Sequence, residues 1–228
     1  MGALPPELYV EEERCPVCGR SFAATKVRLS RLEVLGRDTD LCVHYRGFNP
    51  YLYSVLVCPH CGYAALESQF HELTEAERRA LEDLLRGRRP ALDFGGERSW
   101  ETGLAAYKLA IFQAERRGAR PSVLAGLCLR AAWLLRSVGD ARERDFLEAA
   151  LNHYLRAHER EAFPVGRLSQ RTVEYLIGEL NLRLGRPEEA AHWFNRVASS
   201  RAEEDKNIVA MAREGWQRAR EALRARPR

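Results

Sequence analysis

Apolar and polar positions follow two different patterns on either side of residue 72. Before it, apolar residues alternate with polar ones or form short runs rich in β-branched and aromatic side chains, which is typical of strands. These stretches cover residues 26–30, 32–34 and 51–57. After it, turn and capping residues separate long stretches that predict helices. The chain is therefore predicted to be α+β, with a small β-rich N-terminal part followed by an all-α part.

The helical part carries explicit start and stop signals. Thr74, with Glu77 three residues later, forms a capping box, and Gly87 and Pro90 end the helix that it opens. A linker is predicted from residue 88 to the glycine pair at 95–96. Further helices are predicted at residues 99–118, 121–138, 141–161, 170–184, 187–199 and 203–224. Because their connections are short, neighbouring helices should form antiparallel hairpins.

These hairpins resemble degenerate tetratricopeptide repeats. Small residues and one aromatic residue fall at the spacings that such repeats use: Gly178, Gly185, Ala190 and Phe194. The same segment departs from the repeat at two positions, because Glu174 and Asn181 stand where it has Trp and Tyr. Trp100 and Tyr107 reproduce the Trp–Tyr spacing in an earlier helix. We expect three loose hairpins that stack into a curved array.

Two short stretches near the N-terminus repeat each other, Cys-Pro-Val-Cys-Gly at 15–19 and Cys-Pro-His-Cys-Gly at 58–62. In each, the glycine can adopt the positive φ that turns both thiols toward one ion. One such pair is compatible with redox chemistry, whereas two matching pairs favour a metal site. Four thiolates saturate a tetrahedral structural zinc ion. The predicted ligands of one Zn²⁺ per chain are Cys15, Cys18, Cys58 and Cys61.

The two cysteine pairs are separated by an unusually long insert. Between Cys18 and Cys58 there are 39 residues, against about 15–20 in the common double pattern. The cost of closing a loop rises by only about 0.6 kcal/mol per doubling of its length, so the insert does not weaken the assignment. We therefore divide the chain into a zinc-ribbon-like domain with a long insert (1–72), a helix and linker (73–98) and a tetratricopeptide-like helical domain (99–228).

Length and composition indicate the class of protein and its compartment. The chain has 228 residues, of which 46% are hydrophobic, with enough apolar material for a core. It contains no apolar run of about 18 residues, and its first residues lack the apolar region of a secretory signal. Six cysteines without an export signal fit metal ligands in a reducing compartment. We expect a cytoplasmic protein that does not engage a membrane.

Charge is unevenly distributed. Residues 1–72 hold seven Lys/Arg against nine Asp/Glu, and the remainder holds 29 against 23, so the overall charge of +4 resides in the helical part. Six arginines lie within residues 212–228, against two glutamates. Cations at a helix C-terminus complement its dipole, which explains them without a ligand. Binding of nucleic acid through this basic end is the alternative function, although the acidic N-terminal part argues against it.

Other candidate ligands are weaker. Cys42, two residues from His44, could replace a ligand or belong to a second site, but a free cysteine commonly serves as a small buried apolar residue. Cys128 lies in an Ala/Leu-rich stretch and is expected in the core. His60 lies inside the second pair, where two cysteines already flank it, and His71 is expected at the surface.

The insert concentrates polar and aromatic residues. Its polar members are Asp38, Asp40, Tyr45, Arg46 and Asn49, with Phe48 and Tyr51 beside them. Such a cluster could line a binding pocket. Alternatively, the two aspartates cap turns while the aromatic side chains cover the metal site. The sequence favours the second interpretation and leaves the first open.

The motifs of the N-terminal part form a recognisable set. They are Cys15-Pro-Val-Cys18, Arg37-Asp38-Thr39-Asp40-Leu41-Cys42, Tyr45, Asn49-Pro50 and Cys58-Pro-His-Cys61-Gly62-Tyr63-Ala64-Ala65. Together they resemble an uncharacterised bacterial family, domain-of-unknown-function family 2225. The resemblance covers most of the chain. It implies the two-part architecture and no activity.

No catalytic constellation is evident. The sequence has no His-Glu-x-x-His motif, no phosphate-cradling glycine loop and no nucleophile elbow, and His153 and His158 are five residues apart on a predicted helix. A catalytic zinc also keeps an open coordination position, which four thiolates do not leave. The sequence therefore predicts a non-enzymatic interaction or scaffold protein, with a structural zinc and a protein or peptide partner on the helical array.

Overall fold

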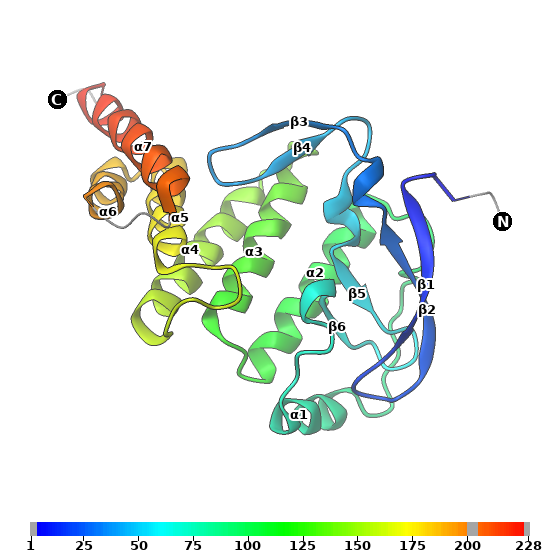
Figure 1. Ribbon diagram of the computed structural model, residues 1–228. Helices are drawn as coiled ribbons and strands as arrows, with labels where there is room; N and C mark the ends of the chain where they lie inside the picture. The colour runs from blue at the N-terminus through cyan, green and yellow to red at the C-terminus, as the bar shows by residue number, and fades with distance from the viewer. Residues whose placement is uncertain (1–3, 200–204, 226–228) are drawn as a thin grey trace.

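The computed structural model describes residues 4–199 and 205–225. Its N-terminal part contains six short strands: β1 (Leu8–Arg14), β2 (Ser21–Val27), β3 (Val34–Arg37), β4 (Val43–Tyr45), β5 (Val55–Val57) and β6 (Ala64–Leu66). Seven α-helices follow in the described residues: α1 (Glu75–Leu85), α2 (Trp100–Arg116), α3 (Pro121–Arg136), α4 (Glu143–Arg160), α5 (Gln170–Arg183), α6 (Pro187–Ala198) and α7 (Lys206–Arg224). The predicted α+β class is confirmed (Figure 1).

The described strands form three separate antiparallel pairs, β1–β2, β3–β4 and β5–β6. Each cysteine pair lies in the turn of one of these hairpins, the first between β1 and β2 and the second between β5 and β6. The β3–β4 hairpin lies within the long insert between the cysteine pairs and reaches across the helices toward α5 (Figure 1). The thiols therefore lie in the turns of β1–β2 and β5–β6, and the β3–β4 hairpin extends away from them.

The first strand has no counterpart among the predicted strands. Three consecutive glutamates at 11–13 hide its alternation. In the structure, Glu11 and Glu13 accept hydrogen bonds of 2.6 and 2.5 Å from the buried Lys26 of β2. Cross-strand pairs of opposite charge stabilise a hairpin, so the acidic run has a structural use.

Two of the predicted strands differ from the structure in position or length. The strand predicted at 26–30 is wrong in position, because β2 ends at Val27 and residues 29–31 form a 3-10 turn. The stretch 51–57 divides into a 3-10 turn (Pro50–Tyr53) and β5. The Asn49 side chain accepts the Tyr51 N–H at 3.0 Å and Pro50 occupies the first turn, which together favour a helical start over a strand.

The predicted helices are confirmed to within a few residues. Thr74 and Glu77 form the predicted capping box at the start of α1. Glycines with positive φ follow several helix ends, including Gly118, Gly139 and Gly185. The start of the last predicted helix, at residue 203, lies outside the described residues.

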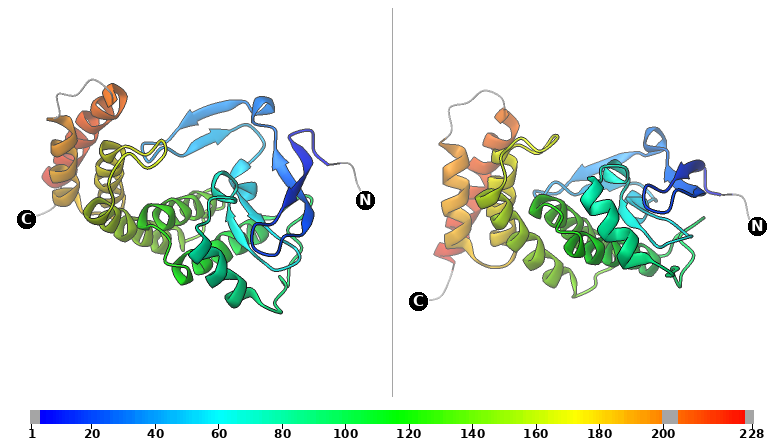
Figure 2. Two further views of the ribbon diagram at one scale, coloured as in Figure 1. Left: turned by 60° about the horizontal axis from the view of Figure 1, so that its bottom comes forward. Right: turned by 90° about the horizontal axis from the view of Figure 1, so that it is seen from below.

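The helices from α2 to α7 pack in sequence order, each against the next. Figure 2 shows this array leading from the β-hairpins to α6 and α7 at the opposite end of the molecule. Phe194 of α6 is fully buried against two glycines, Gly178 of α5 and Gly215 of α7. A Cβ at these positions would lie 2.9 and 2.6 Å from ring carbons of Phe194. The absence of side chains therefore sets the spacing of three helices.

We expect Gly215→Ala to lower the free energy of unfolding. Overpacking a core costs about 1–3 kcal/mol, which outweighs the gain of up to about 1 kcal/mol from the better helix former. Urea unfolding followed by circular dichroism measures the change. Gly126→Ala is the matched control, since its Cβ would meet only the end of the Arg130 side chain, at 3.1 Å, and should leave stability equal or higher. Equal stability of both variants would contradict the packing.

Candidate metal centre

The two cysteine turns have the same backbone construction. In the first, the Gly19 N–H donates to the Cys15 carbonyl at 2.9 Å and the Cys15 N–H to the Arg20 carbonyl at 3.0 Å. In the second, the equivalent bonds run from Gly62 to Cys58 at 2.9 Å and from Cys58 to Tyr63 at 2.8 Å. Both glycines have positive φ, 71° and 76°. That conformation is open to glycine at little cost, which explains the residue after each second cysteine.

The two turns bring four sulfurs together. The Sγ atoms of Cys15 and Cys61 are 3.7 Å apart, as are those of Cys18 and Cys58, and all four lie within 4.8 Å of one another. A tetrahedral ion with metal–sulfur bonds of about 2.3 Å would separate its ligands by about 3.8 Å. A disulfide would need about 2.0 Å. The cluster is therefore arranged as a set of metal ligands and could hold one ion.

The thiols perturb one another's ionisation. Hydrogen bonding to Cys58 raises the pKa of Cys15 to about 12, while hydrogen bonding from Cys15 lowers the pKa of Cys58 to about 2. The pKa of Cys61 is also raised, chiefly by its contact with Cys15. Without a cation the cluster keeps few negative charges, because adjacent thiolates repel. A divalent ion would stabilise all four as thiolates.

Apolar side chains surround the cluster on its inner side. Phe22, Tyr63 and Phe70 pack in the same buried group as the cysteines, with ring centroids of Tyr63 and Phe70 4.9 Å apart. Leu81 and Leu85 of α1 complete this group. Helix α1 therefore belongs structurally to the metal centre and covers one side of it.

A buried amide joins the second cysteine turn to α2, beside the packing of β5 and β6 on that helix. Gln113 of α2 is 2% exposed. Its side-chain N–H donates to the Gly62 carbonyl at 2.7 Å, and its carbonyl accepts the Ala64 N–H at 2.9 Å. Both ends of the amide are used, so the turn can take only one position against α2.

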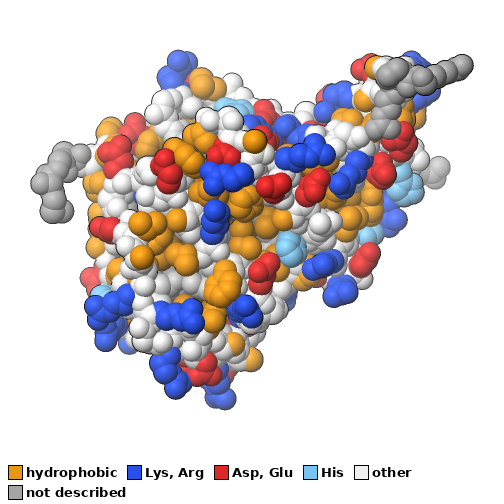
Figure 3. Space-filling view, turned by 180° about the vertical axis from the view of Figure 1, so that it is seen from behind, with side chains coloured by type: hydrophobic (Ala, Val, Ile, Leu, Met, Phe, Trp, Pro, Cys, Tyr) orange, Lys and Arg blue, Asp and Glu red, His pale blue; other side chains and the backbone are white. Residues whose placement is uncertain are grey.

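The outer side of the cluster faces a basic pocket of about 570 Å³. Its lining includes Arg20, Arg86, Arg88 and Arg89 beside Cys18 and Cys61. In Figure 3, Lys and Arg side chains gather at the lower end of the molecule, where Figure 1 places α1. These cations offset the negative charge that four thiolates and the C-terminus of α1 place there. His60 contacts the Ser21 carbonyl at 3.1 Å, and the exposed His71 contacts Glu13 at 3.0 Å.

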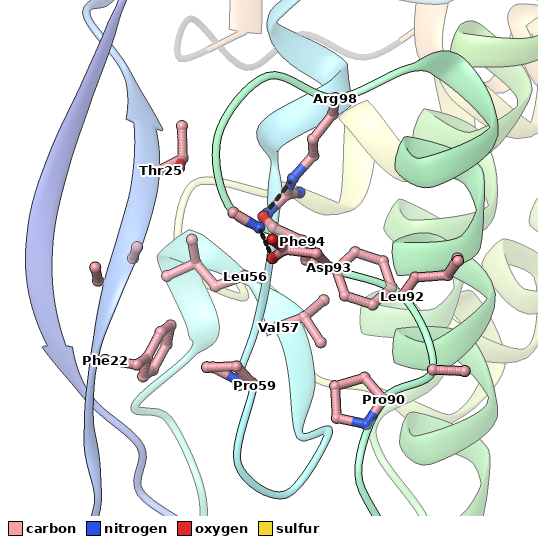
Figure 4. Close-up of a pocket in the computed structure, with 14 residues that line it drawn as sticks. Phe22, Thr25, Leu56, Val57, Pro59, Pro90, Leu92, Asp93, Phe94 and Arg98 are labelled. Atoms are coloured by element: carbon pink, nitrogen blue, oxygen red, sulfur yellow. Dashed lines mark hydrogen bonds between the residues drawn. The ribbon is translucent and has the colours of Figure 1, made fainter. Parts of the chain in front are cut away.

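The linker after α1 is fastened by Arg98. This buried side chain donates to the backbone carbonyl of Phe94 through Nε and Nη2, at 3.0 and 2.8 Å, and to those of Leu52 and Val55 through Nη1, at 3.1 and 2.9 Å. Burial lowers the pKa of Arg98 to about 10. A pocket of about 330 Å³ lies between this linker, β2 and β5 (Figure 4). Arg98 thus ties the linker to the strands that lead into the second cysteine turn.

The tip of the insert (residues 38–42) docks onto the helices and lies away from the metal centre. Asp40 is fully buried and accepts hydrogen bonds from Arg136 Nη2 at 2.6 Å and from Trp133 Nε1 at 3.0 Å. Arg136 also bonds to Asp38 at 2.8 Å. The Tyr175 hydroxyl donates to the Thr39 carbonyl at 2.5 Å, and the Thr39 hydroxyl donates to Glu179. These contacts join the tip to α3 and α5.

This docking changes the interpretation of the polar insert. Asp40 does cap the turn, through the Cys42 N–H at 3.3 Å. The aromatic residues do not cover the metal site as expected: Tyr51 packs on Trp133 with ring centroids 5.1 Å apart, and Phe48 stacks on Tyr53 at 5.8 Å. Arg136 and Trp133, the partners that decide the arrangement, lie more than ninety residues away in sequence. Local patterns could not identify them.

Asp38, Cys42 and His44 form a second group with ligand atoms within 4.8 Å of one another. Asp38 is already bonded to Arg136 and, at 2.8 Å, to His44. Burial raises the pKa of the Cys42 thiol to about 12, and the side chain lies in the apolar core of the helices. The geometry matches the expectation that Cys42 is a buried apolar residue. Cys128 is likewise buried.

Comparison with known proteins confirms the resemblance to domain-of-unknown-function family 2225. The family model described as "Uncharacterized protein conserved in bacteria (DUF2225)" matches residues 8–219. The chain belongs to this family. It is also 27% identical over 141 residues to an uncharacterized protein of Borreliella burgdorferi, covering 54% of this chain and 50% of that protein. The match therefore spans about half the length of this relative. No solved structure matches the chain.

Among the described residues, no helix combines the length and apolar character needed to cross a bilayer.

We expect Asp40→Asn to lower the free energy of unfolding by about 3–5 kcal/mol, because Arg136 loses its one fully buried carboxylate partner and keeps only the partly exposed Asp38 and Glu143. Asp38→Asn is the matched control: Asp38 is partly exposed and bonds to the same arginine, so its loss should cost far less. Denaturant titration of both variants measures the difference. Equal losses would show that Asp40 is not the residue that anchors the insert.

Proposed function

We propose that the chain is a non-enzymatic protein-interaction module whose four cysteines hold one structural zinc ion. Tetrahedral sulfur ligands are typical of zinc or of iron–sulfur chemistry. Four ligands at the separation of a closed site leave no open position for a substrate, which favours a structural role. On this proposal the ion holds the two hairpin turns together and supports the helices behind them.

The observation that carries the proposal is a groove of about 610 Å³ on the helical array. This helical groove is bounded by the insert tip, α3, the connection between α4 and α5, and the residues that follow β6. Leu41, Leu129 and Leu176 contribute apolar surface to it. An apolar groove between helices and a docked loop suits an extended segment of another protein.

The alternative, nucleic-acid binding through the basic C-terminal end, receives less support. Among the described residues, Arg218 bonds to Glu179 at 2.8 Å and the Arg220 guanidinium lies 4.6 Å from the centroid of Trp216. Arg226 and Arg228 lie outside the described residues. Arginines already engaged within the protein contribute less to phosphate binding. The groove therefore favours a protein partner.

Metal analysis of the purified chain should give one zinc ion per chain. Cys15→Ser and Cys58→Ser should lose the ion, since each removes a ligand, whereas Cys42→Ala should retain it. A chelator should lower the unfolding temperature of the wild type and leave that of Cys15→Ser unchanged. Zero or two ions per chain, or the visible absorption of iron, would contradict the four-thiolate zinc site.

Selection from a phage-displayed library of random dodecapeptides on the zinc-loaded chain tests the interaction. We expect enrichment of peptides that no longer bind Val123→Arg, because this substitution places a long side chain in the helical groove. Fluorescence anisotropy of the labelled peptides gives the affinities. Enrichment of no peptide, or of peptides that bind Val123→Arg equally well, would contradict the groove as the interaction site.

A further inference from the structure

One polar group that lines the helical groove makes no hydrogen bond to the described residues of the protein. Tyr154 of α4 is 4% exposed, and its side chain lines the groove. Within residues 4–199 and 205–225, its hydroxyl makes no hydrogen bond. The other buried tyrosines near this region are satisfied: Tyr107 donates to the Tyr51 carbonyl at 2.9 Å and Tyr175 to that of Thr39. Among the described residues, no side-chain oxygen that is buried from solvent lacks a hydrogen-bond partner, so the Tyr154 hydroxyl oxygen reaches solvent and is free to donate to a ligand.

A cation lies beside it. Arg130 of α3 lines the same groove, and its charge acts on Tyr154. Its Nη1 donates to the Gly126 carbonyl at 3.1 Å, and its guanidinium lies 5.9 Å from the centroid of Trp133. No carboxylate of the described residues lies within ion-pair distance of Arg130. Gly126 leaves the space in which the side chain folds back, because a Cβ there would lie 3.1 Å from Nη1.

Two of the acidic groups near the groove are bonded to other residues of the protein, and a third is exposed. Asp40 is bonded to Arg136, and Glu161 accepts both the N–H and the hydroxyl of Ser122, at 2.7 and 2.6 Å. Glu72 is an exposed member of the lining, and Arg167 adds a second cation. The groove therefore combines apolar walls with a guanidinium that pairs with no carboxylate of the described residues and a phenolic hydroxyl that makes no hydrogen bond to them.

We propose that the helical groove recognises a carboxylate on an extended peptide segment of a partner protein. An Asp or Glu side chain, or the C-terminal carboxylate, accepts hydrogen bonds from Arg130 and from the Tyr154 hydroxyl. Neighbouring apolar side chains of the peptide pack on Leu129 and Leu176. The charge of the groove argues for this occupant, because a carboxylate pairs with a guanidinium in planar geometry and accepts a hydroxyl donor at the same time. This inference rests on the proposed function and specifies the ligand of the same groove.

The test uses the peptides enriched from the random dodecapeptide library, resynthesised with each acidic residue changed to its amide and with an amidated C-terminus. We expect one carboxylate whose removal weakens binding to the full-length zinc-loaded chain about tenfold or more. Tyr154→Phe and Arg130→Gln should weaken the parent peptide by similar factors. The same two substitutions should weaken binding of the peptide that carries the amide little further, because that peptide has already lost the carboxylate that both side chains contact.

The matched control is Arg220→Gln, which removes another guanidinium stacked on a tryptophan, outside the groove. It should bind the parent peptide as the wild type does. Thermal unfolding of each variant shows that it is folded. Tyr154→Phe keeps the ring and deletes only the hydroxyl. Its effect on peptide affinity therefore tests the proposal even if Arg130→Gln fails to fold.

The outcomes separate the two proposals. Peptides that bind in the groove without any carboxylate preference would overturn this inference and leave the proposed function standing. Enrichment of no peptide would overturn both. Free N-acetylglutamate serves as a competitor of the labelled peptide. If it displaces the peptide with an affinity equal to that of the peptide itself, the groove binds a small carboxylate, and the proposal of a peptide segment is overturned.

Discussion

Four sulfur atoms set the positions of two chain segments that are about forty residues apart. The turns at Cys15 and Cys58 close separate two-stranded hairpins, and a two-stranded hairpin is only marginally stable alone in water. Convergence of the four thiols supplies what these small sheets lack. It also fixes both ends of the insert, so the insert can extend over the helices from a rigid base.

The second anchor of the insert is the fully buried Asp40, held by Arg136 and Trp133 of α3. With the base set by the cysteine turns and the tip set by this contact, Leu41 is held at the edge of the helical groove despite an unusual φ of 72°. A non-glycine residue adopts this conformation only where its surroundings determine it. The groove is therefore assembled from segments that meet only in the folded chain.

Local signals predicted much of this protein. The cysteine spacing, the glycine after each pair and the capping box of Thr74 depend on residues a few positions apart, and each was confirmed in position. β1 was missed because its acidic residues bond to Lys26 across the hairpin, which a single-strand pattern does not reveal. Arg136, Trp133 and Tyr154 could not be predicted as a site, because what matters is which distant segment each one meets.

Gln113 gives the metal centre a direct connection to the helices. Its amide bonds to the backbone of Gly62 and of Ala64, on either side of Tyr63. Both bonds can form only when the second cysteine turn has this conformation. If that turn relaxed because the four sulfurs moved apart, both hydrogen bonds would break inside the protein, where water cannot replace them. A change at the four sulfurs at one end of the molecule would thereby reach the last turn of α2. Removal of a bound metal or oxidation of the thiols would then act on the helical array through Gln113, in addition to the packing of β5 and β6 on α2.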